Sequence, residues 1–148
     1  LPSTDGRRIE LYRRISKYED AGHGECLLLN ASIAEIVQDN LVYFNGRSYH
    51  LLAWCIMPNH VHVLFEPFEK RMLGKICHSW KSYTAKQINK VLGRTGEVWE
   101  REGYDRFIRN DEHYANVLRY IEMNPVKAGL VSAPENWPFS SVAQKLRD

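Results

Sequence analysis

The sequence predicts an α+β domain in which helices cover one face of an antiparallel sheet. Three observations indicate this fold class: helical periodicity in separate segments, strand-like runs between them, and a Pro58-Asn59 turn that joins two neighbouring strands into a hairpin. The chain has 148 residues, of which 44% are hydrophobic and 26% charged, so it can bury one substantial core. We therefore expect residues 1–148 to form a single domain.

Composition excludes several classes of protein. No apolar run approaches the roughly 18 residues that span a bilayer, so we expect no membrane partner. The net charge of +2 is too small to indicate a polyanionic partner by itself. The three cysteines form no CxxC pair and lie among apolar residues, and no signal peptide opens the chain, which favours the cytoplasm. Because the first residue is Leu rather than Met, we expect further residues to precede it.

Two helices are predicted in the N-terminal third of the chain. Residues 9–18 are basic, and the Ala-Gly-His-Gly run over 21–24 interrupts them, so we expect one short helix there. Further on, Ser32 and Glu35 form a capping box. Apolar residues then recur at helical spacing, which predicts a core-facing helix over 32–44.

A hairpin is predicted in the middle of the chain. Residues 49–57 are rich in aromatic and branched types, which is typical of a strand buried on both faces. Residues 60–66 alternate with period two, so that His60 and His62 point to one face while Val61 and Val63 point to the other.

The second half is predicted to hold a long helix, a strand and a final helix. Residues 73–92 place apolar side chains on one side and lysines on the other. Residues 97–109 are aromatic and alternating, with Gly103 as an interruption. Asn110 begins a helix that we expect to end at Asn124, because a residue that precedes proline is disfavoured in the α conformation. An irregular tail is expected to follow.

Two histidines in the second strand of the hairpin are candidate metal ligands. His60 and His62 are separated by one residue, so their Cα atoms lie about 6.5 to 7 Å apart on one face of a strand. Both imidazoles can then reach one metal ion. A histidine pair on a strand is also common as half-buried polar residues without a ligand, so a metal site requires further ligands.

The final predicted helix offers such a ligand. His113, Tyr120 and Asn124 are spaced by seven and four residues, so they lie within roughly 40° of one another on a polar stripe. Tyr120 is a candidate nucleophile, and the amide oxygen of Asn124 suits a hard cation. This nitrogen and oxygen donor set favours Mg²⁺ or Mn²⁺ over a closed structural zinc site. Spacing alone favours another interpretation, in which Tyr120 packs at the core edge and Asn124 caps the helix.

Six segments resemble the single-tyrosine transposases of the His-hydrophobic-His class, and in particular the REP-associated tyrosine transposases. They occur in the order typical of that family, and the span that contains them covers about two thirds of the chain. The segments are AWCIMPNHVHVLFEP at 53–67, WKSYTAKQIN at 80–89, VWE at 98–100, YDRFIR at 104–109, YIEMNPVKAGL at 120–130 and WPFSS at 137–141.

This resemblance implies a ferredoxin-like sheet and a metal-dependent endonuclease and strand transferase that acts on hairpin-containing single-stranded DNA. Tyr120 would attack the scissile phosphate and form a 5′-phosphotyrosine link. His60, His62 and Asn124 would hold Mg²⁺ or Mn²⁺, which suits the chemistry because a phenol with a pKa near 10 is a poor nucleophile at neutral pH. A homodimer is compatible with the family.

Basic residues are candidates for contact with the DNA phosphates, although a lysine stripe on a helix is more often a solvated surface. The candidates are Lys75, Lys86, Arg101, Arg106, Arg109 and Arg119.

Two departures from the family pattern leave questions open. A hydrophobic opening strand is not recognisable, so the first strand of the sheet is not assured in this chain. Asn124 stands where the insertion-sequence branch commonly has Gln, so the amide reaches one methylene less far. Two alternatives to the transposase remain: a non-catalytic module that binds single-stranded or hairpin DNA, and a metallohydrolase in which His60 and His62 serve an activated water.

Overall fold

The computed structural model describes residues 13–21 and 25–147. The described chain contains eleven helices and strands of three or more residues. In order they are β1 (Arg14–Glu19), the 3-10 helix η1 (Leu27–Leu29), α2 (Ala31–Tyr43), β2 (Tyr49–Ile56), β3 (His60–Pro67), η2 (Lys70–Met72), α3 (Leu73–Leu92), β4 (Tyr104–Phe107), α4 (Asp111–Lys127), η3 (Pro134–Asn136) and α5 (Ser141–Arg147).

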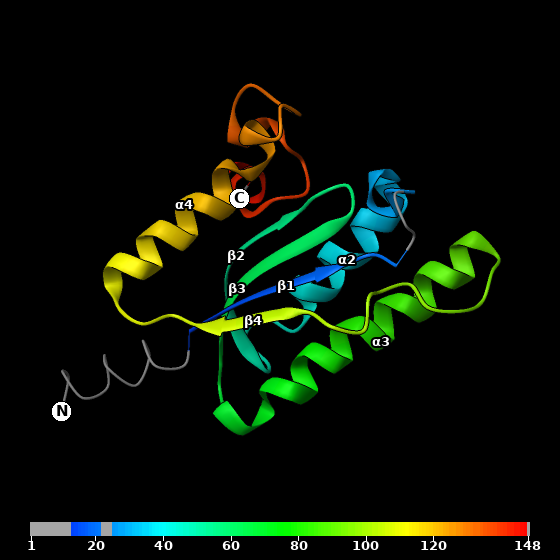
Figure 1. The fold of residues 1–148 in the computed structure, drawn as a ribbon, viewed down its shortest axis with the longest axis horizontal. Coiled ribbons are helices and arrows are strands. Elements are labelled where there is room, and N and C mark those ends of the chain that lie inside the picture. The colour runs from blue at the N-terminus through cyan, green and yellow to red at the C-terminus, as the bar shows by residue number, and fades with distance from the viewer. Residues whose placement is uncertain (1–12, 22–24, 148) are drawn as a thin grey trace.

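Four antiparallel strands form one sheet in the order β2-β3-β1-β4, with helices between β1 and β2 and between β3 and β4 (Figure 1). This is the ferredoxin-like α+β arrangement, so the predicted fold class is confirmed. The central strands are β3 and β1. Their pairing places Lys17 beside His62, and Tyr104 of β4 beside Lys17 on its other side.

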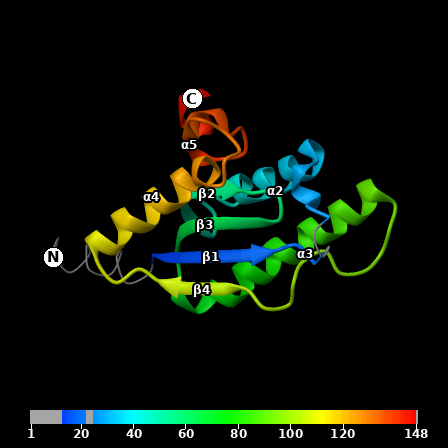
Figure 2. The same ribbon diagram turned by 45° about the horizontal axis from the view of Figure 1, so that its top comes forward.

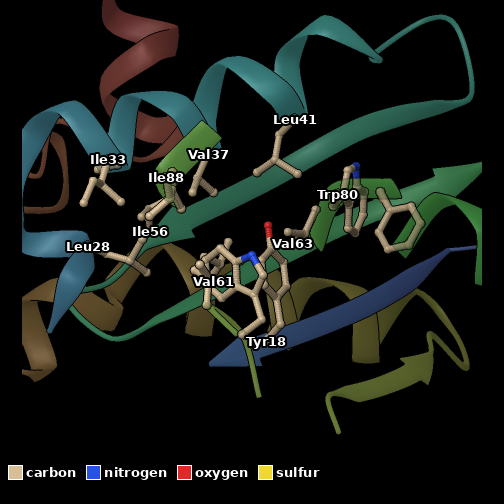
Figure 3. Close-up of a cluster of buried hydrophobic side chains, with 14 of the residues drawn as sticks. Tyr18, Leu28, Ile33, Val37, Leu41, Ile56, Val61, Val63, Trp80 and Ile88 are labelled. Carbon is tan, nitrogen blue, oxygen red and sulfur yellow. The ribbon is translucent and has the colours of Figure 1, made fainter. Parts of the chain in front are cut away.

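One face of the sheet carries the larger core, which is covered by α2 and α3. The odd-numbered residues of β3, Val61, Val63 and Phe65, are fully buried in it. Trp80 of α3 is buried in this core (Figure 3) and donates a hydrogen bond of 3.0 Å to the hydroxyl of Tyr49, which donates in turn to the backbone of α2 at 2.6 Å. The polar atoms of Trp80 and Tyr49 are thereby satisfied inside the core, whereas the buried hydroxyl of Tyr18 has no hydrogen-bond partner among the described residues.

The opposite face carries a smaller core under α4. Ile15, Leu64 and Ile121 are buried there, together with residues of β2. Figure 2 shows α4 and α3 on opposite sides of the sheet. We expected helices on one face of the sheet. α2 and α3 cover one face, and α4 forms a further layer on the other face. His62 belongs to the α4 face, because it alternates with Val61 and Val63.

The prediction of a short helix over 9–18 is wrong for its described part, since residues 14–19 form β1. The open question about the first strand is answered by the same segment, which occupies a central place between β3 and β4. Ile15 packs toward α4 and Tyr18 toward α3, which is the period of two of a strand. Arg14 of this strand finds its partner, Asp105, on the neighbouring strand β4, a contact that local sequence does not reveal. Residues 9–12 lie outside the described chain.

The predicted helix boundaries need two corrections. Asn30, rather than Ser32, caps α2, because its side chain accepts a hydrogen bond of 2.9 Å from the Ser32 backbone. The expected end of the final helix at Asn124 is also wrong, since α4 continues through the buried Pro125 to Lys127. Proline removes only one backbone donor, and the helix ends within one turn of it.

The tail is more ordered than expected and closes one edge of the sheet. It contains η3 and α5, and Phe139 accepts a backbone hydrogen bond of 2.9 Å from Ile56 at the end of β2. Trp137 donates from its indole to the Ile56 carbonyl at 2.8 Å. In the described chain no helix is long and apolar enough to cross a bilayer.

Candidate active site

The two predicted metal ligands lie side by side at the start of β3, on the face that α4 covers. The rings of His60 and His62 meet edge to face with centroids 4.8 Å apart. Their neighbours across the sheet are Glu19 and Lys17 of β1, respectively. The strand alternation predicted from the sequence therefore places both imidazoles on one face.

Both imidazoles are held in the neutral form. Burial lowers the pKa of His62 to about 3, and the electrostatic interactions with His60 and Lys17 act in the same direction. Burial also lowers the pKa of His60, assisted by Lys17 and opposed by Glu19 and Asp20. A neutral imidazole keeps a lone pair free, which is the form that binds a metal ion.

The ring nitrogens are arranged to offer such lone pairs. The Nδ1 atom of His60 lies 2.7 Å from the side-chain oxygen of Asn59, which can only accept, so Nδ1 carries the proton and Nε2 is left as an acceptor. His62 is 3% exposed, and its buried Nε2 has no hydrogen-bond partner among the described residues. An orphaned buried nitrogen is costly, and a metal ligand is a common reason to retain one.

The donor set around the pair is restricted. Within residues 13–21 and 25–147, no cluster of three His, Cys, Asp or Glu side chains could hold a metal ion. A third protein ligand would therefore be of another type, such as an amide.

The predicted nucleophile lies directly against this pair. The ring of Tyr120 meets that of His62 edge to face, with centroids 5.3 Å apart. Tyr120 is 48% exposed, so a large ligand can approach its hydroxyl. Its helix is fixed at the N-terminus by Asn110, whose side chain accepts from the His113 backbone at 2.8 Å.

A hollow of about 360 Å³ opens beside Tyr120, between α4 and the strands β1 and β4. Its lining combines an apolar floor with polar and aromatic walls. The residues are Ile15, Lys17, His62, Tyr104, His113, Asn116, Val117 and Tyr120. Larger hollows lie elsewhere, but this one contains the histidine and the phenol. Its size and mixed lining are typical of a small-ligand subsite.

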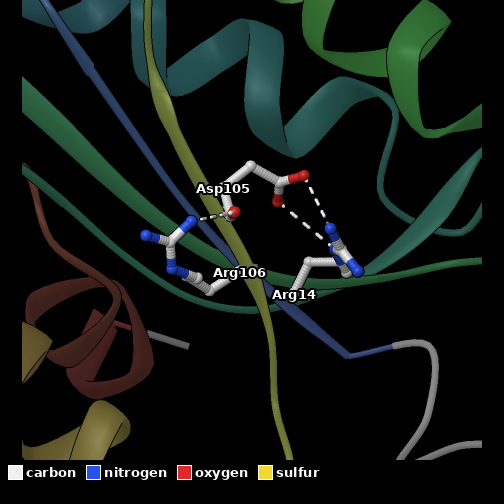
Figure 4. Close-up of polar contacts among 3 residues, drawn as sticks. All are labelled: Arg14, Asp105 and Arg106. Carbon is white, nitrogen blue, oxygen red and sulfur yellow. Dashed lines mark hydrogen bonds and ion pairs between the residues drawn. The ribbon is translucent and has the colours of Figure 1, made fainter.

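An ion pair fixes β4 against β1 on the α3 face of the sheet, opposite the hollow. Arg14 binds Asp105 through two hydrogen bonds of 2.8 and 3.3 Å (Figure 4). On the other face of β4, the guanidinium of Arg106 lies 4.8 Å from the centre of the Tyr104 ring. The edge strand thus presents an aromatic and a cationic side chain together next to the hollow.

The other sequence-predicted residues divide into two groups. Asn124 is half-buried on α4, one turn beyond Tyr120. Arg106 and Arg109 are close to the hollow, and the backbone of Arg109 donates to the ring of His113 at 3.0 Å.

The remaining basic residues are exposed at other places. Arg119 precedes Tyr120 on α4, and Arg101 forms an ion pair of 3.5 Å with Glu97. Lys75 and Lys86 lie on α3, in the helical layer on the opposite side of the sheet from Tyr120. These two lysines are therefore remote from the nucleophile.

Sequence reasoning missed Lys17 and Asn116 as site residues. Lys17 was hidden by the wrong helix prediction, although its alternation with Ile15 was a usable signal. Asn116 stands four residues before Tyr120, so the helical spacing that selected Asn124 could have selected it too.

Comparison with known proteins identifies the family. The profile of the family described as "Transposase IS200 like" matches residues 29–124. A candidate REP-associated tyrosine transposase of Haemophilus influenzae is 31% identical over 109 residues, covering 63% of this chain and 58% of that protein. The REP-associated tyrosine transposase of Escherichia coli is 30% identical over 95 residues, covering 64% and 55%. The chain spans a little over half the length of these relatives.

Solved structures share the fold. A REP-associated tyrosine transposase bound to a REP hairpin superposes with a TM-score of 0.72 and 21% identity, covering 94% of this chain and 81% of that one. A candidate transposase of Deinococcus radiodurans gives a TM-score of 0.52 and 16% identity, covering 74% and 88%. With the profile match extending over more than half of the sequence, the predicted family is confirmed: this chain belongs to the IS200-like transposases.

Proposed function

We propose that this protein cuts and rejoins hairpin-containing single-stranded DNA through a covalent bond to Tyr120. The observation that carries the proposal is the contact between the Tyr120 ring and His62, a buried histidine with an unpartnered nitrogen. It brings an accessible phenol beside a pair of neutral imidazoles, as phosphoryl transfer with a divalent cation requires. The hairpin ligand bound by the structural relative supports the substrate class.

A divalent cation, Mg²⁺ or Mn²⁺, is proposed to be held by His60, His62 and Asn124. When bound, such an ion would polarise a phosphate oxygen and stabilise the negative charge of the phosphoryl group in the transition state. The free lone pair of His60 Nε2 and the orphaned Nε2 of His62 fit this role. Asn124 adds an amide oxygen from the same helix that carries Tyr120.

Tyr120 is the proposed nucleophile. Its phenolic oxygen forms a bond to the scissile phosphorus while the bond from phosphorus to the 3′ oxygen breaks. The phenolic proton passes to water, and the departing oxygen takes up a proton to become a 3′-hydroxyl. Because the phosphotyrosine link retains the energy of the phosphodiester, attack by another 3′-hydroxyl reverses the step and joins the strands.

Lys17 is positioned to bind the scissile phosphate. It neighbours His62 across the sheet and lines the same hollow as Tyr120. Its charge opposes protonation of both histidines and attracts a phosphate oxygen. It thus favours both the metal-binding form of the histidines and the substrate.

Basic residues would guide the flanking strand. Arg106 and Arg109 adjoin the hollow and are proposed to contact phosphates next to the cleaved one. Arg101, which precedes β4, and Arg119 of α4 are proposed as contacts further from the cleaved phosphate. Lys75 and Lys86 would contact DNA only where it continues around the domain to the α3 layer. We also propose that the protein acts in the cytoplasm.

A denaturing gel tests the proposal. The protein is incubated with labelled hairpin-bearing single strands and Mg²⁺ or Mn²⁺, and a slower band that survives denaturant marks a covalent adduct. We expect the adduct with wild-type protein and with Tyr83→Phe, because Tyr83 lies in another hollow between α2 and α3. We expect none with Tyr120→Phe or in the presence of a chelator.

The same assay separates the alternatives. Cleavage without an adduct would indicate a metallohydrolase and would contradict the phosphotyrosine step. Binding that persists in the chelator, with neither adduct nor cleavage under either metal, would indicate a binding module.

A further inference from the structure

We infer that the hollow beside Tyr120 is a subsite for one unpaired nucleobase that adjoins the scissile phosphate, with Tyr104 as its stacking surface and Asn116 as its hydrogen-bonding partner. This inference rests on the proposed function, because it assigns the nucleotide that accompanies the phosphate. In the proposed strand transferase, the protein would then contact a base directly at the point of cleavage.

The first argument is the shape and lining of the hollow. Its volume of about 360 Å³ falls within the usual range for small-ligand sites. Ile15 and Val117 form an apolar floor, and the ring of Tyr104 forms an aromatic wall. A flat heterocycle prefers such surroundings, whereas a phosphate or a sugar does not.

The second argument is the placement of Tyr104. It is 46% exposed although it is aromatic, and it stands on the edge strand β4. The guanidinium of Arg106, 4.8 Å from the ring centre, restrains the ring and adds a positive charge for the neighbouring phosphate. Bases stack on exposed aromatic rings of this kind in proteins that bind single strands.

A second aromatic residue near β4 does not compete for this role. Trp99 is only 5% exposed, and its indole donates a hydrogen bond of 2.9 Å to Thr84 of α3. Its ring packs against Tyr18 in the larger core. Trp99 therefore stabilises the fold and cannot receive a base.

The third argument is the position of Asn116. It is exposed, lines the hollow, and precedes Tyr120 by one helical turn, whereas Asn124 follows Tyr120 by one turn and is not part of the lining. Its carboxamide offers a donor and an acceptor together, which match the edge of a base. The helix thus places a base-binding amide before the nucleophile and the proposed metal-binding amide after it.

Charge supports a phosphate beside the base. Lys17 lies between His62 and Tyr104 in the sheet and lines the hollow, and it pairs with Glu19 at 3.2 Å. A phosphate bound by Lys17 therefore lies next to a base that stacks on Tyr104.

The test is an abasic scan. A cleavable strand is first selected from a pool of hairpins with randomised single-stranded flanks, by sequencing the DNA in the covalent adduct. Each nucleotide around the cleaved position is then replaced in turn by an abasic residue, and the initial rate of adduct formation is measured at subsaturating DNA. With wild-type protein, the initial rate of adduct formation should fall about tenfold when the abasic residue stands at one nucleotide next to the scissile phosphate.

Variants assign that loss to the subsite. In Tyr104→Ala the adduct with intact DNA should form about tenfold more slowly, and the abasic residue should cause no further loss. Tyr104→Phe should behave as wild type because the ring is retained. Asn116→Ala should reduce the discrimination among the four bases at that nucleotide. Phe107→Ala is the matched control, because Phe107 is an exposed aromatic on the opposite face of β4, and it should leave the scan unchanged.

The outcomes are distinguishable from failure of the proposed function. If wild-type protein forms no adduct with any strand, the function fails, and the scan is repeated as equilibrium binding of Tyr120→Phe to strands selected for binding. An abasic replacement that weakens binding of Tyr120→Phe at one nucleotide, but no longer does so once Tyr104→Ala is added, then supports the subsite independently. In either assay, an abasic loss of the same size in Tyr104→Ala and wild type, or unchanged base discrimination in Asn116→Ala, overturns the inference.

Discussion

The two faces of the sheet are filled in different ways. The α2 and α3 face is the larger core, in which Val61, Val63 and Phe65 are fully buried and the indole of Trp80 pairs with the hydroxyl of Tyr49. The α4 face has a smaller core, a buried histidine with an unpartnered nitrogen, and an open hollow. A single strand, β3, contributes to both. One set of alternate residues is buried in the larger core, and the other set faces the proposed catalytic site.

Neighbouring residues of β3 give the largest expected contrast between the faces. His62→Leu should lower the rate of adduct formation roughly a thousandfold or more, because the metal ligand is lost. It should leave the free energy of unfolding unchanged or raise it, since a buried unpartnered nitrogen is replaced by an apolar side chain of similar volume. Rates of adduct formation and urea unfolding measure the two effects.

Val63→Ala is the matched variant on the other face. It should cost about 2 kcal/mol of stability and leave the adduct rate nearly unchanged. A large loss of activity in Val63→Ala, or wild-type activity in His62→Leu, would break the division between the faces.

Trp80 tests the larger core on its own. Trp80→Ala should lower the free energy of unfolding by about 3 to 5 kcal/mol, because the ring is fully buried and its hydrogen bond to Tyr49 is lost. Chemical denaturation provides the measurement. The folded fraction should retain the adduct rate of wild type per folded molecule, and a rate reduced beyond the folded fraction would show that the α3 face also shapes the site.

Lys17 tests the electrostatics of the α4 face. Lys17→Met keeps the aliphatic stem but removes the charge, so the adduct rate should fall roughly 10- to 100-fold with little change in stability. Adduct formation measured against DNA concentration shows whether binding or the chemical step is affected. Wild-type rates at every concentration would remove Lys17 from the site.

The smallest expected effect concerns the ion pair between β1 and β4. Arg14 and Asp105 are partly exposed, at 16% and 33% of their side chains, so their coupling energy should be about 1 kcal/mol or less. A double-mutant cycle of Arg14→Met and Asp105→Asn in urea unfolding measures it. A coupling well above this range would mean that the edge strand depends on the pair more than its exposure indicates.

The sequence predicted those parts of the fold in which local pattern and tertiary packing agree. The long helix over 73–92 was predicted with its observed bounds, because its apolar stripe faces the core and Gly93 ends it in a left-handed conformation. β1 was predicted wrongly because it has only two apolar residues, and Arg14 is stabilised by an ion pair with Asp105 on a strand that is distant in sequence. The expected end at Asn124 failed because burial of Pro125 outweighs the local preference.

The residues of the candidate site also differ in whether local sequence could predict them. His60, His62 and Tyr120 were predictable because spacing within one strand and one helix places each of them. Lys17 was not, because its place beside His62 depends on the pairing of β1 with β3, which are distant in sequence. Its contribution could be recognised only once the sheet order was known.

Mass spectrometry of the digested adduct tests the central claim most directly. The protein is reacted with a hairpin-bearing single strand and Mn²⁺, treated with nuclease and protease, and the peptide that retains a nucleotide is sequenced. The account predicts a single modified residue, Tyr120, joined to a 5′-phosphate. A nucleotide attached to Tyr83 or another residue, or cleaved DNA with no modified peptide, would contradict it.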